Sequence, residues 1–227
     1  MGACTTIRVA IIADTHGFID PRIAEAVRAC DVAVHAGDIG NAEVLHTLQR
    51  PATVARDARR RPRVPRVSPP RSPDTLPPSQ RMPGHRRNTA SLAGSPAARA
   101  PRLGKWPLIA VRGNNDTAKH WGANANNMLA ALPEEAALDL PGGALVVVHG
   151  HRAGAVAGRH ARLRHVYPQA RVVAYGHSHR LVCDQSQYPW ILNPGAAGRA
   201  RTYGGPSCLV LHAGSGQWRV EAIRFAN

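Results

Sequence analysis

Five short apolar segments of this chain each run directly into a polar motif of Asp, Asn, His and Gly. Each segment is rich in Val, Ile, Leu or Ala, which predicts a buried strand followed by a loop. We expect strands at 7–13, 31–35, 108–111, 144–148 and 171–175. The motifs that follow them are Asp14-Thr15-His16, Gly37-Asp38, Gly113-Asn114-Asn115-Asp116, His149-Gly150-His151 and Gly176-His177-Ser178-His179.

Helices are expected between the first strands, and short strands at the end of the chain. Apolar spacing predicts helices over 21–30, 41–49 and about 157–166, with Pro21 in the first turn and Asn41 as an N-cap. Further strands are expected at 190–192, 208–212 and 218–225, where Trp218, Val220 and Ala222 should face the core. This order favours an α/β fold with a mixed sheet or sheets.

Segment 51–105 does not follow this pattern. It holds 11 of the 19 prolines, 13 of the 29 Lys and Arg, and two of the 14 Asp and Glu, so it carries +11 of the net charge of +15. It shows no sustained apolar period, and we expect disorder because it cannot bury enough apolar surface. The predicted organisation is one domain, 1–227, interrupted by this basic insert.

Two interpretations of the insert stay open. It is either a basic segment with weak contact to nucleic acid or another polyanion, or an accident of coding. Arg, Pro, Ala and Gly share GC-rich codons, so translation of a GC-rich gene in a shifted reading frame gives a similar composition. Reading the gene in all frames would decide between them.

The polar motifs predict a metal site. Carboxyl ends of strands in an α/β sheet meet at one crevice, so the side chains that follow them should converge. The set combines carboxylate and amide oxygens with imidazole nitrogens, which suits Mn, Fe, Co, Ni or Zn. Seven ligands are too many for one tetrahedral ion and suit two ions that share a carboxylate. The candidates are Asp14, His16, Asp38, Asn114, His149, His177 and His179.

The order of these motifs resembles the calcineurin-like metallophosphoesterase superfamily, and within it the small single-domain YfcE-type phosphodiesterases. The resemblance covers nearly the whole chain except 51–105. It implies a four-layer αββα sandwich of two mixed β-sheets flanked by helices. The segments that carry it are ADTHG (13–17), HAGDIGN (35–41), VRGNND (111–116), VVHGH (147–151), YGHSH (175–179) and NPGA (193–196).

The resemblance also implies how the ligands divide. Asp14, His16, Asp38 and His179 would bind one of two divalent ions, for which Mn²⁺ is expected, with Ni²⁺, Fe²⁺, Co²⁺ or Zn²⁺ as alternatives. Asp38, Asn114, His149 and His177 would bind the second, with Asp38 shared. A water between two such ions would lose a proton near neutral pH and attack a phosphate ester in line.

One position departs from the family pattern. Many members have His after the Gly-Asn pair as a general acid, and the YfcE-type branch often has Cys there, whereas this chain has Asn115. His151 is a candidate substitute, so the candidate catalytic residues are Asp38, Asn115 and His151. Asp116 is expected to orient His16 or cap a loop. Arg199 and Arg201 either meet a phosphate or form a solvated basic loop.

Three functions follow from these features. The first is a dinuclear metal phosphodiesterase, the second a phosphoesterase-like binding scaffold related to the small retromer subunit, and the third a nucleic-acid binder acting through 51–105. Four cysteines without a CxxC pair favour the reducing cytoplasm. The chain has no run of about 18 apolar residues, which excludes an ordinary membrane-spanning helix.

Overall fold

The computed structural model describes residues 6–49, 67–68, 107–122 and 125–227. The prediction of disorder for 51–105 lies outside these residues, apart from the short strand β3 (Val67–Ser68), which pairs with β5 (Glu135–Leu140). None of the described helices has the length and apolar character needed to cross a bilayer. In the described part of the chain, Cys183 and Cys208 have free thiols.

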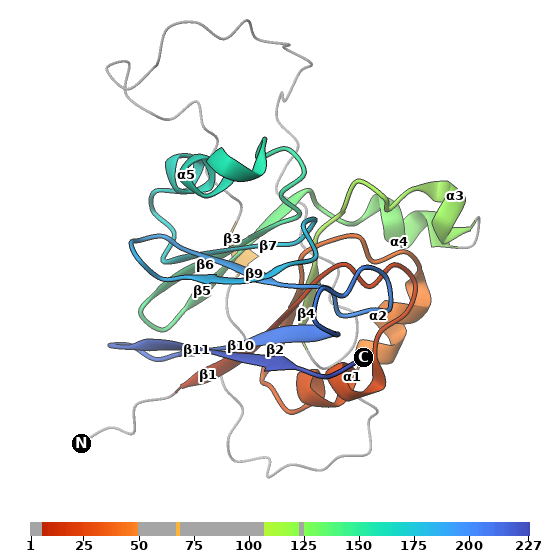
Figure 1. The fold of residues 1–227 in the computed structure, drawn as a ribbon, viewed down its shortest axis with the longest axis horizontal. Coiled ribbons are helices and arrows are strands. Elements are labelled where there is room, and N and C mark those ends of the chain that lie inside the picture. Colours follow the sequence, from red (N-terminus) through yellow and green to blue (C-terminus); the bar gives the residue numbers. More distant parts are fainter. Residues whose placement is uncertain (1–5, 50–66, 69–106, 123–124) are drawn as a thin grey trace, which may run out of the picture.

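Two mixed sheets form the centre of the molecule (Figure 1). In the first, with order β11-β10-β1-β2-β4, the strands β1, β2 and β4 run parallel, and β10 pairs antiparallel with β1 and β11. Its strands are β1 (Ile7–Ile12), β2 (Val32–His35), β4 (Leu108–Ala110), β10 (Ser207–Ala213) and β11 (Trp218–Arg224).

The second sheet has the order β3-β5-β6-β7-β9-β8. The central strands β6, β7 and β9 run parallel, and the outer pairings are antiparallel. The strands not yet given are β6 (Gly143–Val148), β7 (Val172–Tyr175), β8 (Leu181–Asp184) and β9 (Trp190–Pro194).

Alternating side chains divide the interior into three apolar layers. Val9 and Ile11 of β1 point into the core between the sheets, together with Leu145 and Val147 of β6. The intervening residues of β1 pack against the helices α1 (Pro21–Arg28) and α2 (Ala42–Leu48). The outer face of β6 and β7 packs against α5 (Val156–Val166).

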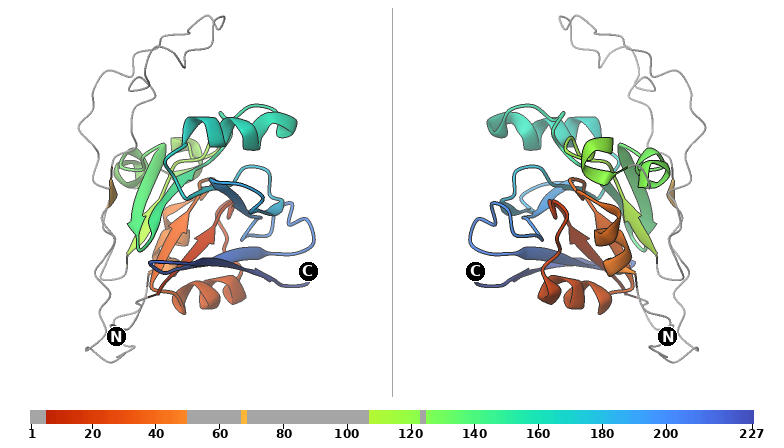
Figure 2. Two further views of the ribbon diagram at one scale, coloured as in Figure 1. Left: turned by 90° about the vertical axis from the view of Figure 1, so that its left-hand side faces the viewer. Right: turned by 90° about the vertical axis from the view of Figure 1, so that its right-hand side faces the viewer.

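The helices cover opposite faces of this pair of sheets (Figure 2). The short helices α3 (Ala118–Trp121) and α4 (Asn126–Ala130) add Trp121 and Leu129 to the apolar layer beneath α1 and α2. The predicted αββα sandwich of two mixed sheets is therefore confirmed, because helices lie outside both sheets and an apolar core lies between them.

Local sequence explains the helix starts that position the site loops. Asp20, which precedes Pro21, is the N-cap of α1, and its side chain accepts a hydrogen bond from the backbone N–H of Arg22. Asn41 is the N-cap of α2, and its side chain accepts a hydrogen bond from the backbone N–H of Val44. The predicted burial of Ala222 on β11 is wrong, because Trp218 is buried there but Ala222 is exposed near the open end of this edge strand.

Candidate metal centre

The five predicted motifs meet where strands β1, β2, β4, β6 and β7 end. Asp14, His16 and His179 bring one potential ligand atom each to within 4.8 Å of one another. The Nε2 atoms of His16 and His179 are 3.1 Å apart, and the His179 Nε2 lies 3.7 Å from Asp14 Oδ1. Nδ1 of His179 donates to the carbonyl of Ala200, so its Nε2 presents a lone pair. This set, called group A below, has the composition of a cation site.

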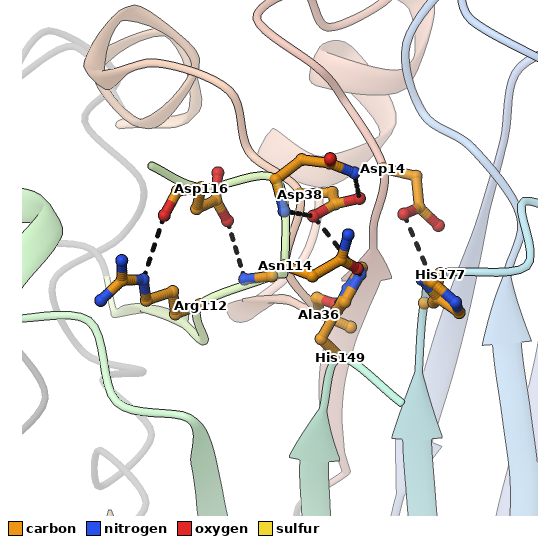
Figure 3. A network of polar contacts seen from close by, with 12 residues as sticks. Asp14, Ala36, Asp38, Arg112, Asn114, Asp116, His149 and His177 are labelled. Atoms are coloured by element: carbon orange, nitrogen blue, oxygen red, sulfur yellow. Dashed lines mark hydrogen bonds and ion pairs between the residues drawn. The ribbon is translucent and has the colours of Figure 1, made fainter. Parts of the chain in front are cut away.

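A second set, group B, is formed by Asp38, His149 and His177. The His149 Nε2 lies 3.4 Å from Asp38 Oδ1 and 3.1 Å from Asn114 Oδ1. Its Nδ1 donates to the carbonyl of Ala36, so Nε2 is directed at the two oxygens. Figure 3 shows Asp38, Asn114 and His149 grouped together, with Asp14 and His177 beside them.

Asp38 belongs to group B and also faces group A. One carboxylate oxygen faces His149, and the other lies 3.8 Å from the His16 Nε2. Asn115 holds both oxygens, with its backbone N–H 2.9 Å from Oδ1 and its side-chain amide 2.7 Å from Oδ2. Burial alone would raise the pKa of Asp38, but the hydrogen bond and charge of His149, together with Asn115, lower it below its usual value. Asp38 therefore stays ionised and can face two cations at once.

The buried carboxyl of Asp14 lacks a hydrogen-bond partner for one of its oxygens. Burial raises the pKa of its carboxyl from 3.8 to about 7, and the nearby charge of Asp38 adds to this effect. Its Oδ1 accepts a hydrogen bond from the backbone of His177, but its Oδ2 is buried without a partner. A buried carboxylate oxygen without a donor is costly, and a bound cation would compensate it. The residues present thus fit divalent metal ions.

The histidines of the centre are shifted toward the neutral form that binds metals. Burial lowers the pKa of His179 to about 4 and also lowers the pKa values of His16 and His177. His149 differs, because its hydrogen bond and attraction to Asp38 raise its pKa despite burial.

The backbone of the site is unusual. Among the described residues other than glycine, six have a positive φ, and five of these are predicted ligands. The φ angles are 54° at Asp14, 47° at His16, 54° at Asp38, 67° at His177 and 57° at His179. Residues other than glycine favour the β or right-handed helical region, so a positive φ is strained for them. Backbone strain of this kind is found mostly at functional sites.

Asp116 ties two of these loops together. Its carboxylate accepts hydrogen bonds from the backbone N–H groups of Gly40 and Gly113, both at 2.8 Å, and from the indole of Trp121 at 3.1 Å. It is fully buried. Of the two predicted roles for Asp116, the structure thus shows the loop cap.

Glycine is required where the loops touch. A Cβ on Gly113 would lie 2.1 Å from the backbone nitrogen of Asp38 and 2.2 Å from its Oδ1.

On the other sheet, the Asn193 side chain donates to the carbonyl of Gly176 and to the hydroxyl of Ser178, and accepts from the backbone N–H of Gly195. The Asn-Pro-Gly turn therefore supports the loop that carries His177 and His179.

His151 lies at the edge of the centre. Its ring centroid is 5.5 Å from that of His149 and 6.3 Å from that of His177, and its Nδ1 is buried without a partner. Burial and the neighbouring His149 lower its pKa. All seven predicted ligands and the two other catalytic candidates, Asn115 and His151, are thus brought to one place.

Sequence reasoning missed two interactions that bear on the site. Thr15 and His35 hydrogen-bond at 2.9 Å beneath the centre, and the Thr15 hydroxyl also donates to Ile39. Thr15 and His35 both lie inside the motifs 13–17 and 35–41, and this position was the sequence feature that could have indicated their contact. The second is the contact of Arg201, whose guanidinium lies 3.1 Å from the His179 Nε2; neither interpretation of this arginine from the sequence included a candidate ligand as its partner.

Comparison with known families agrees with this geometry. The model of the calcineurin-like phosphoesterase superfamily domain matches residues 7–56 and 92–216, which is more than half of the chain. The chain belongs to the calcineurin-like phosphoesterase superfamily. The match is interrupted at 57–91, inside the segment interpreted as an insert, and curated proteins give no match. The two matched ranges of this calcineurin-like phosphoesterase include every motif that contributes a residue to group A or group B.

Solved structures show the same fold. A predicted phosphoesterase from Streptococcus pneumoniae superposes with a TM-score of 0.53 at 17% identity, over 98% of this chain and 91% of its own. An archaeal phosphodiesterase gives 0.54 at 15%, over 96% and 100%. Vacuolar protein sorting 29 from Cryptosporidium parvum gives 0.56 at 12%, over 98% and 99%. At these identities the calcineurin-like phosphoesterase shares the fold with all three.

Proposed function

We propose that this protein is a phosphodiesterase that works with two divalent cations. The observation that carries the proposal is the position of Asp38, whose two carboxylate oxygens face His149 of group B and His16 of group A. Two cations held close together need a shared anion between them, and such pairs clamp the oxygens of an in-line displacement. The proposed substrate is a phosphate ester.

The ligands divide between the cations as the geometry suggests. Group A with Asp38 would hold one cation, and group B with Asn114 the other. When bound, the cations would activate a water as nucleophile and stabilise charge on the phosphoryl group. We propose Mn²⁺, with Ni²⁺, Fe²⁺, Co²⁺ or Zn²⁺ as alternatives, because oxygen and imidazole ligands suit all of them.

Asn115 and His151 have different proposed roles. Asn115 donates to both oxygens of Asp38 and so holds this carboxylate, but a carboxamide does not deliver a proton to a leaving group. His151 is the proposed proton donor, since its ring lies beside His149 and its Nδ1 has no partner. Its lowered pKa leaves little imidazolium at neutral pH, so esters with good leaving groups should react best.

The proposed domain organisation is one phosphoesterase domain over 1–227, with 51–105 as an insert. Every described motif comes from outside this segment. Hydrolysis by a variant that lacks 57–91, where the family match is interrupted, would support this division.

The decisive experiment measures hydrolysis of bis(p-nitrophenyl) phosphate by the full chain in Mn²⁺. Chelation and the variant Asp38→Asn should each abolish turnover, whereas Glu43→Gln, at an exposed position on α2, should not change it. Comparison with p-nitrophenyl phosphate separates a diesterase from a monoesterase. A folded, metal-loaded protein that turns over neither ester would contradict the proposal and favour a binding scaffold.

A further inference from the structure

Three arginines belong to the segments that border group A. Arg180 directly follows the ligand His179, and Arg199 and Arg201 lie in the loop 195–205 after the Asn-Pro-Gly turn. All three are exposed. Neither this loop nor residues 177–180 contain an Asp or Glu, and none of the ion pairs found among the described residues involves these arginines. This side of the centre therefore concentrates positive charge, and the nearby acidic group that Arg201 acts on is the buried carboxyl of Asp14.

The loop is fixed against the metal centre. A Cβ on Gly198 would lie 2.4 Å from the carbonyl oxygen of Thr15, so the loop packs directly on the segment that carries Asp14 and His16. The Arg199 guanidinium stacks on the Phe18 ring at 3.5 Å from its centroid. Gly198 and Arg199 thus fix this part of the loop beside the segment that carries Asp14 and His16.

Arg201 is positioned to meet an anion at the centre. Its Nη2 lies 3.1 Å from the His179 Nε2, which accepts the hydrogen bond because Nδ1 is already donating to Ala200. A cation bound by His179 uses the same lone pair. The guanidinium is then free to direct its N–H groups to a phosphoryl oxygen, for which its fork of donors is suited.

An exposed aromatic ring lies next to this arginine. The Tyr203 backbone N–H donates to the Arg201 carbonyl, and its side chain is 49% exposed. Arg180 lies over the ring at 4.3 Å from its centroid. A planar guanidinium on a half-exposed tyrosine offers stacking surfaces to a further flat ring, as in proteins that bind nucleobases by stacking.

We propose that Arg180, Arg201 and Tyr203 form a substrate subsite that binds a phosphodiester carrying a planar aromatic group, as in a nucleotide. Arg201 binds the phosphoryl oxygens, and the Arg180–Tyr203 pair stacks on the ring of the organic half. This assignment rests on the proposed function, because it places the substrate phosphate beside groups A and B. It adds a preference among esters that the ligands themselves do not supply.

The kinetic test compares two esters with the same leaving group. Thymidine 5′-(p-nitrophenyl phosphate) and ethyl p-nitrophenyl phosphate both release p-nitrophenolate, so their ratio of kcat/KM reports the non-leaving half. The Mn²⁺-loaded full chain should prefer the nucleoside ester by about fivefold or more, which is the low end of one stacking contact. Tyr203→Ala and Arg180→Ala should each lower this ratio.

Tyr188→Ala is the matched control. Tyr188 is also exposed, at 60%, and stacks on Trp190 away from these loops. Its removal should leave the ratio and both rates unchanged. Equal kcat/KM for the two esters in the unmodified protein, or an unchanged ratio in Tyr203→Ala, would overturn the subsite while leaving the phosphodiesterase proposal in place.

A binding measurement keeps the subsite testable if no ester is hydrolysed. Calorimetry of the Mn²⁺-loaded protein with thymidine 5′-monophosphate and with inorganic phosphate separates the two parts. Arg201→Ala should weaken both ligands, whereas Tyr203→Ala should weaken the nucleotide about fivefold and leave phosphate affinity unchanged. Equal loss for both ligands in Tyr203→Ala, or no loss in either variant, would contradict the assignment.

Discussion

The Nε2 atoms of His16 and His179 lie 3.1 Å apart, on rings that stack with an interplanar angle of 24°. These residues are far apart in the sequence and come from different sheets. Two imidazole nitrogens at this distance share a hydrogen bond when one of them carries a proton, and both can bind a cation through their lone pairs when neither does. The spacing therefore makes a direct prediction about metal binding.

Replacement of His179 by Ala should weaken one of two bound cations. Loss of a direct ligand is expected to reduce affinity at group A by at least the tenfold typical of residues that only orient a ligand. Calorimetric titration with Mn²⁺ measures both the number of ions and their affinities. His46→Ala, at an exposed position on α2, should bind two ions like the unmodified protein. Equal binding by both variants would exclude group A as a metal site.

Asp14 should make the metal-free protein less stable as the pH rises. Burial raises its folded-state pKa to about 7, so its favourable contribution is complete below about pH 4 and is lost as the pH rises through 7. Asp14→Asn carries no charge, so its free energy of unfolding should increase relative to the unmodified protein between pH 4 and 7, by about 4 kcal/mol at most.

Denaturant unfolding in chelator at pH 5 and pH 8 measures this difference. The histidines with lowered pKa act in the opposite direction, but they are common to both proteins and do not enter the comparison. Addition of Mn²⁺ at pH 8 should restore the unmodified protein and not the variant. A difference that stays constant with pH would show that the Asp14 carboxyl is ionised at pH 5.

Asp116→Ala should destabilise the protein by about 3 kcal/mol or more. The change leaves two backbone N–H groups and the Trp121 indole without their buried acceptor. Chemical denaturation of the metal-free chain measures the loss. Glu43→Ala, at an exposed helix position, should change stability by less than about 0.5 kcal/mol. A similar small effect at Asp116 would mean that the loops at Gly40 and Gly113 do not depend on this cap.

His160→Ala should weaken the docking of α5. His160 bridges the Asp184 carboxylate at 3.0 Å and the Tyr175 hydroxyl at 3.1 Å, and so joins the helix to β7 and β8. We expect a loss of about 1–2 kcal/mol in the free energy of unfolding. His165→Ala, on an exposed face of the same helix, is the control and should have little effect. Equal values for the two variants would argue against the bridge.

The convergence of the candidate ligands was predictable from the sequence, because each polar motif directly follows a predicted strand. The strand β5 was not, since its sequence Glu-Ala-Ala-Leu-Asp-Leu consists of residues that favour helices, and its pairing with β6 imposes the extended form. The edge strand β8 is half-exposed and lacks an apolar run. The contacts of His160 and Arg201 depend on segments distant in sequence, so no local pattern revealed them.

The positive φ angles of the five proposed ligands restrict which metals this site could be changed to prefer. Asp, Asn and His are the residues other than Gly that enter the left-handed region most readily. They are also ligands for hard and borderline cations, whereas selection of soft metals requires thiolate or thioether side chains. The main chain thus limits both side-chain choice and ion choice at these positions. A redesign toward copper(I) would have to change the loop conformations before it changed the ligands.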